Sequence, residues 1–111
     1  MKHGLPFSTI QKIVTVLSHH AQVERAILYG SRAKGNYKKG SDIDLTLLGG
    51  PELTLRVLFR ILNDLDELSL PYTFDLSIFN DISDPDVIEH IQRVGVTFYT
   101  KGEVVAEPVS A

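Results

Sequence analysis

Two short segments in which polar and apolar residues alternate constrain the fold more than any other feature of this sequence. Residues 41–48 read Ser-Asp-Ile-Asp-Leu-Thr-Leu-Leu, and residues 72–79 read Tyr-Thr-Phe-Asp-Leu-Ser-Ile-Phe. Because successive side chains of a β-strand point to opposite faces, each segment predicts a strand with one buried and one polar face. The polar faces carry Asp42, Asp44 and Thr46 on the first strand, and Thr73, Asp75 and Ser77 on the second.

The residues between these two segments have the periodicity of an amphipathic helix. A helix from Glu52 to about Leu68 is predicted, and Ser69 to Pro71 ends it. Its apolar stripe consists of Leu55, Leu58, Leu62 and Leu65, with Ile61 beside it.

Shorter patterns mark four further elements. Ser8 precedes a stripe of helical spacing, and a later helix has Asp84 as its cap, Pro85 at its first position and Gly95 at its end. The predicted ranges are 9–20 and 85–94 for these helices, and 26–29 and 96–100 for two more strands. This order predicts an α/β fold, a mixed β-sheet of about four strands with helices packed on one face.

The composition limits the classes of function. With 43% hydrophobic residues, residues 1–111 are expected to form a single domain, with 101–111 as a tail. A net charge of −3 gives no global positive field, so direct binding of nucleic acid is not expected. The absence of cysteine excludes disulfides and thiolate metal sites. With no apolar run near the roughly 20 residues that span a bilayer, and no signal-peptide core, the expected location is the cytoplasm, with no membrane contact.

The aspartates of the polar faces predict a metal site. Asp42 and Asp44 lie on one side of a strand, about 6.6 Å apart by the usual rise, and an adjacent strand can supply Asp75. Hard oxygen ligands without cysteine or paired histidine favour Mg²⁺ or Mn²⁺. Two such ions about 3.5 to 4 Å apart are the standard device for in-line phosphoryl displacement.

The segment after the first short strand complements this acidic cluster. Gly30 and Ser31 offer backbone N–H groups and a hydroxyl at a turn, a plausible cradle for phosphate. It is not a Walker P-loop, because Ser41 and a strand follow the glycine-bearing stretch where that motif needs a helix. Residues 31–41 also contain four basic side chains, which are interpreted as part of a solvated loop: Arg32, Lys34, Lys38 and Lys39. The four histidines are interpreted as surface residues.

The sequence Gly30-Ser31-Arg32-Ala33-Lys34-Gly35, followed by Ser41-Asp42-Ile43-Asp44-Leu45, resembles the signature of the polymerase-β-like nucleotidyltransferase superfamily, in its minimal nucleotidyltransferase branch. The resemblance covers nearly the whole chain, and Asp75 matches the third carboxylate of the family. It implies that Gly30 and Ser31 contact the triphosphate of an NTP, that Asp42, Asp44 and Asp75 bind metal, and that Asp75 helps to deprotonate the acceptor.

The same resemblance implies a reaction and a partner. Transfer of NMP is expected, with ATP as the family default and AMP as the group transferred. Minimal nucleotidyltransferases typically accompany a small all-helical HEPN-type protein, so this chain would be the antitoxin of a toxin–antitoxin pair and would attach AMP to a tyrosine of its partner. Val104, Val105 and Val109 of the tail are candidates for that contact or for a homodimer.

Two other classes of function remain open at this stage. The chain could be a non-catalytic subunit that neutralises a partner while its metal site is vestigial, although every signature position is filled. A nucleic-acid-binding module is disfavoured by the net charge and by the lack of a basic face with stacking aromatics.

Overall fold

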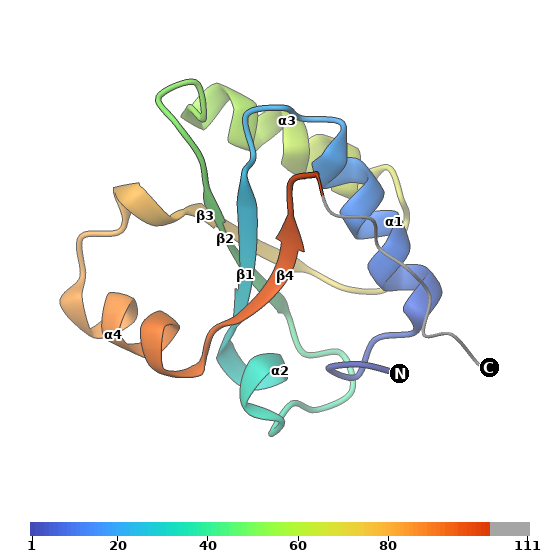
Figure 1. Ribbon diagram of the computed structural model, residues 1–111. Coiled ribbons are helices and arrows are strands. Elements are labelled where there is room, and N and C mark those ends of the chain that lie inside the picture. The colour runs from blue at the N-terminus through green and yellow to red at the C-terminus, as the bar shows by residue number, and fades with distance from the viewer. Residues whose placement is uncertain (103–111) are drawn as a thin grey trace.

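The computed structural model describes residues 1–102 and confirms that the alternating segments are strands of one mixed sheet (Figure 1). The strands are β1 (Arg25–Tyr29), β2 (Ile43–Leu48), β3 (Phe74–Ile78) and β4 (Val96–Thr100), in the order β3-β2-β1-β4. Strand β2 pairs antiparallel with β1 and parallel with β3, while β4 pairs antiparallel with β1. The predicted mixed sheet of four strands is therefore confirmed.

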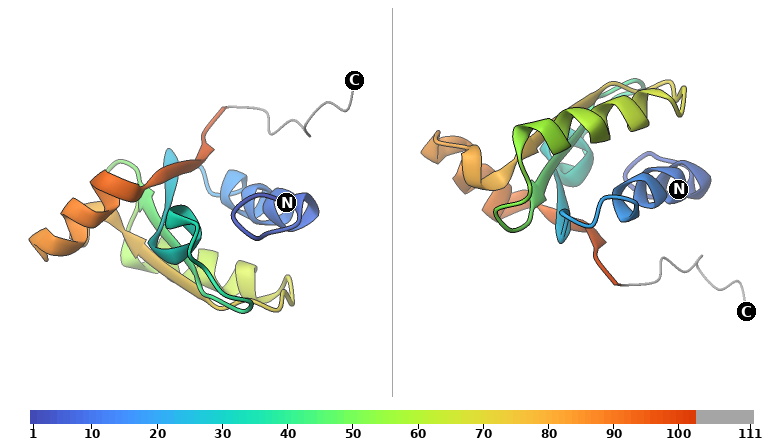
Figure 2. Two further views of the ribbon diagram at one scale, coloured as in Figure 1. Left: turned by 90° about the horizontal axis from the view of Figure 1, so that it is seen from below. Right: turned by 90° about the horizontal axis from the view of Figure 1, so that it is seen from above.

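The helices divide between the two sides of this sheet, whereas packing on one face was predicted (Figure 2). They are α1 (Phe7–Ser18), α2 (Gly30–Lys34), α3 (Leu55–Asp66) and α4 (Pro85–Val94), with a 3₁₀ turn η1 (Phe79–Asp81). Parallel strands need a crossover connection, and α3 supplies it between β2 and β3. Helices α1 and α3 lie together over one face, and α4 extends away from them.

The core lies between the sheet and the pair α1 and α3. Its fully buried side chains include Ile13, Leu17, Leu28, Ile43, Leu45, Leu47, Ile61 and Leu65. Since the odd-numbered residues of β2 are all in this set, its even-numbered residues face the other way, as the alternation predicts. In the described part of the chain, no helix is both long enough and apolar enough to cross a membrane.

The polar face of the sheet is partly covered. Thr46 is completely buried and its Oγ1 accepts a hydrogen bond of 2.9 Å from Ser77 Oγ, so the two hydroxyls satisfy each other. Helix α4 lies against this face, where Gly95 approaches the Ile27 side chain and Ile91 is buried. The strand ends that carry the aspartates remain accessible, because Asp75 is exposed.

Helix α1 begins earlier than the sequence predicts. Its first residue is Phe7, and the Pro6 carbonyl accepts hydrogen bonds from the N–H groups of Thr9 and Ile10 at 3.0 and 3.2 Å. Ser8 therefore lies inside the first turn and does not cap the helix, so the prediction of a start at Thr9 after a Ser8 cap was wrong by two residues. The fixed φ of proline is already suited to this position.

Helix α3 is shorter than predicted, and its buried stripe matches the predicted one only in part. A turn in which Leu53 N–H bonds to Gly50 O precedes it, and Thr54 Oγ1 accepts from Val57 N–H at 3.4 Å as the cap. The buried residues are Val57, Leu58, Ile61 and Leu65. Leu55, predicted to belong to the core stripe, is 56% exposed.

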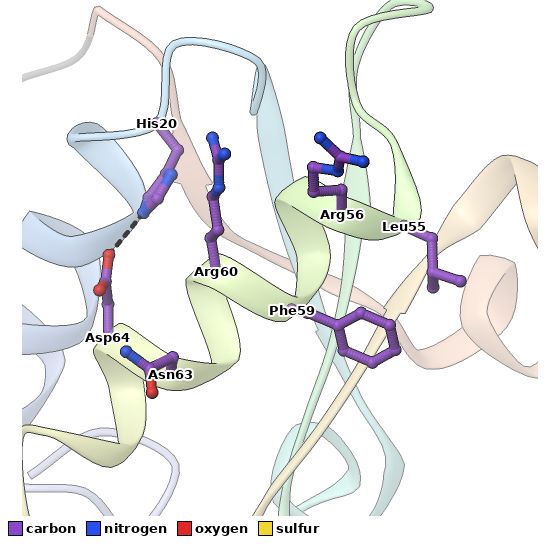
Figure 3. Close-up of a pocket in the computed structure, with 7 residues that line it drawn as sticks. All are labelled: His20, Leu55, Arg56, Phe59, Arg60, Asn63 and Asp64. Atoms are coloured by element: carbon purple, nitrogen blue, oxygen red, sulfur yellow. Dashed lines mark hydrogen bonds and ion pairs between the residues drawn. The ribbon is translucent and has the colours of Figure 1, made fainter.

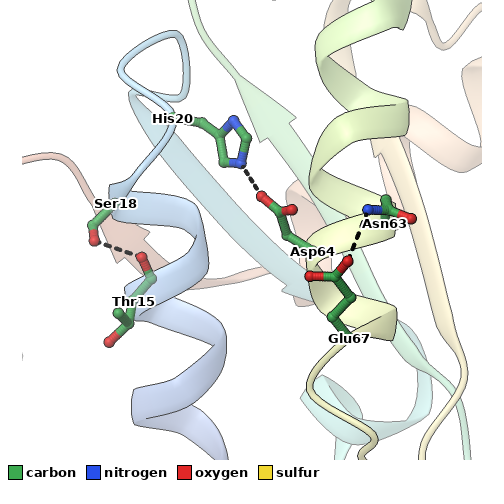
Figure 4. Close-up of polar contacts among 6 residues, drawn as sticks. All are labelled: Thr15, Ser18, His20, Asn63, Asp64 and Glu67. Carbon is green, nitrogen blue, oxygen red and sulfur yellow. Dashed lines mark hydrogen bonds and ion pairs between the residues drawn. The ribbon is translucent and has the colours of Figure 1, made fainter.

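A polar contact joins the end of α1 to α3 (Figure 4). His20 Nε2 lies 2.8 Å from Asp64 Oδ2, and the His20 side chain is only 15% exposed. The interpretation of His20 as a free surface residue was therefore wrong. The three valines proposed as a contact in the tail lie outside the described residues.

Candidate active site

The register of the sheet brings two of the predicted aspartates together. Asp44 of β2 is the partner of Asp75 on the parallel strand β3, so their side chains point to the same face on strands about 4.8 Å apart. On its other side, Asp44 pairs with Tyr29, the last residue of β1. Gly30 and Ser31 follow Tyr29 directly, so the predicted phosphate turn and the predicted metal carboxylates meet at one end of the sheet.

Gly30 is required at this junction. Its φ is +73°, a conformation that side chains with a Cβ rarely adopt. A Cβ added at Gly30 would also collide with Asp44 Oδ2. Backbone and carboxylate can approach this closely only because residue 30 has no side chain.

The surroundings of Asp44 disfavour its ionisation. Burial raises the pKa of Asp44, and the charges of Asp75 and Asp42 raise it further. His90 and Arg32 act in the opposite direction and lower the pKa of Asp44, but the net shift is upward. A cation bound here would relieve this repulsion.

The donor set fits Mg²⁺ in chemistry. Asp42 immediately precedes β2 and is exposed, while Asp44 and Asp75 are fixed by their strands. Within residues 1–102, however, no three carboxylate or histidine side chains are close enough together to form a ready-made metal site. Coordination of one ion by all three aspartates therefore requires these side chains to move towards one another, which the exposure of Asp42 and Asp75 allows.

The sequence interpretation missed His90. This residue of α4 was interpreted as lying on the surface, but its Nε2 accepts a 3.3 Å hydrogen bond from the Gly30 N–H. Its ring also stands edge-on to Tyr29, at 6.1 Å between centroids and 80° between planes. Burial raises the pKa of the Tyr29 hydroxyl, as do the nearby charges of Asp75 and Asp44. No spacing rule could have found His90, because the contact spans 60 positions and involves a single histidine.

Arg32 was also misinterpreted as part of a solvated loop. It is 2% exposed, and its Nε and Nη2 donate to the Ser41 carbonyl at 3.1 and 2.7 Å. Its Nη1 donates to the His3 carbonyl at 2.9 Å. The guanidinium lies 5.4 Å from the centre of the Tyr37 ring and 5.1 Å from that of Tyr72. Arg32 thus fixes the chain just before Asp42, whereas Lys34, Lys38 and Lys39 are exposed as predicted.

This arrangement combines a backbone turn for an anion with carboxylates for a cation at adjacent strand ends. The family model described as "Polymerase beta, Nucleotidyltransferase" matches residues 11–104, which is most of the chain and includes every residue of the site. The chain belongs to the polymerase beta nucleotidyltransferase family. The resemblance identified from the two motifs is confirmed, while the roles of Gly30, Ser31 and the three aspartates in this nucleotidyltransferase remain predictions.

Known proteins similar to this nucleotidyltransferase include a protein of Haemophilus influenzae named "Probable protein adenylyltransferase MntA". The two are 33% identical over 82 residues, which cover 74% of this chain and 71% of the relative.

Solved structures share the fold of this nucleotidyltransferase. A chain in a crystal structure of a toxin–antitoxin with AMP-PNP gives a TM-score of 0.68 at 20% identity, covering 84% of this chain and 74% of that one. A chain in the structure of a tri-AMPylated Shewanella oneidensis HEPN toxin in complex with its MNT antitoxin gives 0.62 at 17% identity, covering 85% and 71%. The α/β nucleotidyltransferase fold is therefore established.

Proposed function

We propose that this nucleotidyltransferase transfers AMP from ATP, with Mg²⁺ or Mn²⁺, to a hydroxyl of a small all-helical HEPN-type partner, and that it acts in the cytoplasm as the antitoxin of the pair. The observation that carries the proposal is the sheet register, in which Asp44 lies between the Gly30 junction and Asp75. The groups proposed to bind phosphate and metal are thereby adjacent, as attack of the acceptor hydroxyl on the α-phosphorus, with pyrophosphate as the leaving group, requires.

Each residue of the site has a distinct task in this reaction. Asp42 and Asp44 would hold the metal, and Mg²⁺ when bound would neutralise the charge of the phosphates. The Gly30–Ser31 turn would bind the triphosphate through the Ser31 N–H and hydroxyl, since the Gly30 N–H is donated to His90 Nε2. Asp75, exposed beside Asp44, would complete the metal site and accept the proton of the incoming hydroxyl.

The relatives support both the reaction and the partner. The similar Haemophilus protein is named as an adenylyltransferase that acts on protein. One structure of the same fold contains AMP-PNP, and another is a complex with an AMPylated HEPN toxin. AMP transfer to a helical partner is the function that joins these relatives to the site geometry.

The test is transfer itself. The purified chain would be incubated with Mg²⁺, each NTP in turn and a HEPN-type protein from the same organism, and the partner would be examined by intact mass and tandem mass spectrometry. We expect the mass gain of AMP on a tyrosine, with ATP only. The matched control is the double variant Asp42→Asn, Asp44→Asn, which should transfer nothing.

Two outcomes would contradict this proposal. Transfer by the double variant at the wild-type rate would remove the metal site from Asp42 and Asp44. Tight binding of the partner without modification by any NTP would leave the chain as a neutralising subunit with a vestigial site.

A further inference from the structure

The outer face of α3 exposes two large apolar side chains. Leu55 is 56% exposed and Phe59 is 59% exposed. They lie one helical turn apart, so they form a continuous apolar strip on the side of α3 that does not contact the sheet. The other large hydrophobic residues exposed to a similar degree in residues 1–102, Met1 and Tyr37, lie on different segments.

Two arginines accompany this strip. Arg56 and Arg60 are also one turn apart, and Figure 3 shows their side chains extending to the same side of the helix. In the part of the chain that the structure describes, neither guanidinium lies within 4 Å of a carboxylate or makes a hydrogen bond. Nearby, the carboxylate of Asp64 is already engaged by His20 at 2.8 Å.

The strip and the arginines line one depression on the surface (Figure 3). It is bordered by Leu55, Arg56, Phe59, Arg60, Asn63 and Asp64 of α3, and by His20 from the turn after α1. We call this set the α3 surface. It combines the two exposed apolar side chains with two arginines that no carboxylate of residues 1–102 approaches within 4 Å.

The α3 surface is separate from the site of chemistry. Helix α3 packs on the face of the sheet that carries Leu45, whereas Asp44 and Asp75 face the opposite side. A protein bound to α3 would therefore leave the nucleotide end of the sheet open.

We infer that the α3 surface is the docking site for an amphipathic helix of a partner protein, whose apolar side chains cover Leu55 and Phe59 and whose acidic residues pair with Arg56 and Arg60. Aromatic residues and arginine are enriched in protein–protein interfaces, where a few such residues carry most of the binding energy. An amphipathic helix fits because its own residues repeat at the same one-turn spacing as the two rows on α3. The inference rests on the proposed function for the identity of this partner as the HEPN-type protein.

A second copy of the chain fits less well. The carboxylate that borders the α3 surface, Asp64, is held by His20, so a two-fold contact would bring unpaired arginines close to one another. Like charges brought together across an interface oppose association. The occupant must supply carboxylates that this surface lacks.

The test measures binding of the separately purified helical partner to the chain by isothermal titration calorimetry. Phe59→Ser should weaken binding by about 30-fold, the size expected when a buried anchor is lost. The double reversal Arg56→Glu, Arg60→Glu keeps Leu55 and Phe59 and should weaken binding at least as much. Binding by the wild-type chain should weaken as salt increases, and this dependence should diminish in the reversal.

The matched control reverses two exposed lysines elsewhere, Lys2→Glu with Lys12→Glu, and so makes the same change in net charge. It should bind the partner like the wild type. All variants should keep wild-type thermal melting and MgATP titration curves, because the α3 surface takes no part in the core or the nucleotide site. If Phe59→Ser unfolds, the double reversal carries the test.

Each adverse result has a distinct meaning. Wild-type partner binding by Phe59→Ser and by the reversal would overturn the inference and leave the proposed function intact. Failure of the wild-type chain to bind the helical protein would overturn the inference and the partner half of the proposed function, while MgATP titration still tests the nucleotide half. A wild-type dimer in light scattering that Phe59→Ser dissociates would assign the surface to a second copy and overturn the inference.

Discussion

The ionised form of Asp44 is destabilised by its position between Gly30 and Asp75. Burial raises its pKa first, followed by the charges of Asp75 and Asp42. Because the pKa in the folded state is above that in the unfolded state, the folded chain binds this proton more tightly. The contribution of Asp44 to the free energy of unfolding therefore falls as pH rises through the window between the two pKa values, and the full penalty applies above it.

Replacement of this carboxylate should therefore stabilise the metal-free protein. We expect Asp44→Asn to have a higher free energy of unfolding than the wild type at pH 7 in EDTA. The difference should shrink as pH is lowered towards the ordinary aspartate pKa of 3.8. Urea unfolding of both proteins across this range measures it, with exposed Asp66→Asn on α3 as the control. An advantage that is absent at pH 7, or that grows in acid, would contradict the assigned repulsion.

His90 should matter for nucleotide binding through Gly30. Its Nε2 accepts from the Gly30 N–H, so its removal frees the turn on which the triphosphate is proposed to rest. We expect His90→Ala to weaken MgATP binding by roughly 2- to 13-fold, the range for one neutral hydrogen bond, with little change in the rate of the bound complex. His90→Gln retains an acceptor and should recover part of the affinity. Titration and single-turnover kinetics separate the two effects; equal affinity in all three proteins would show that the contact is incidental.

Among the elements, the strands were predictable because their signal is local. The alternation in β2 and β3 states which side chains share a face, and this alone places Asp44 and Asp75 on one side of the sheet. Which strands are neighbours depends on pairing across the chain, so the position of Tyr29 and Gly30 beside Asp44 could not be predicted from periodicity and is shown by the sheet register.

Helix α3 shows why the same reasoning failed for a helix. Its apolar residues satisfy two overlapping stripes, one through Leu55 and Leu62 and one through Val57 and Ile61. Helical spacing is compatible with both stripes, and only packing against the sheet determines that Ile61 is buried and Leu55 is exposed. Leu55, left exposed from the predicted stripe, joins Phe59 in the α3 surface.

Helix α2 carries Arg32, a buried side chain that anchors the segment between α2 and β2 and that residue type could not reveal. Arginine in a glycine- and lysine-rich loop is usually solvated, yet Arg32 bonds to the Ser41 and His3 carbonyls. Arg32→Ala should lower the free energy of unfolding by about 3 kcal/mol, because it leaves buried carbonyls without charged donors. Arg32→Lys should cost less, since an ammonium group can replace some of the bonds. Urea unfolding measures both effects. In the control, Lys34→Ala at the exposed neighbour, the free energy of unfolding should stay within about 0.5 kcal/mol of the wild type. An equally small effect of Arg32→Ala would show that the loop does not depend on Arg32.

At the scale of the whole molecule, the sheet separates two functions. One face and its two helices provide stability and the α3 surface, while the ends of β1, β2 and β3 provide the groups proposed to bind nucleotide and metal. This end of the sheet gives up some stability, because the charges of Asp75 and Asp42 and the burial of Asp44 outweigh the opposite charges of His90 and Arg32. Ligand binding should return that stability.

This stabilisation by bound ligand should be measurable as a shift in the melting temperature. A ligand that binds only the folded state at 100 times its dissociation constant adds about 2.7 kcal/mol to the free energy of unfolding. For a domain of this size that corresponds to a rise of roughly 10 °C, which differential scanning calorimetry resolves easily.

We expect the rise with ATP and Mg²⁺ together. With ATP and EDTA it should be much smaller, because the triphosphate then adds negative charge to an unneutralised carboxylate cluster. The double variant Asp42→Asn, Asp44→Asn should start from a higher melting temperature and gain little from Mg²⁺, since both the repulsion and the metal ligands are gone. An equal rise in EDTA, or in the double variant, would mean that the nucleotide binds away from these aspartates.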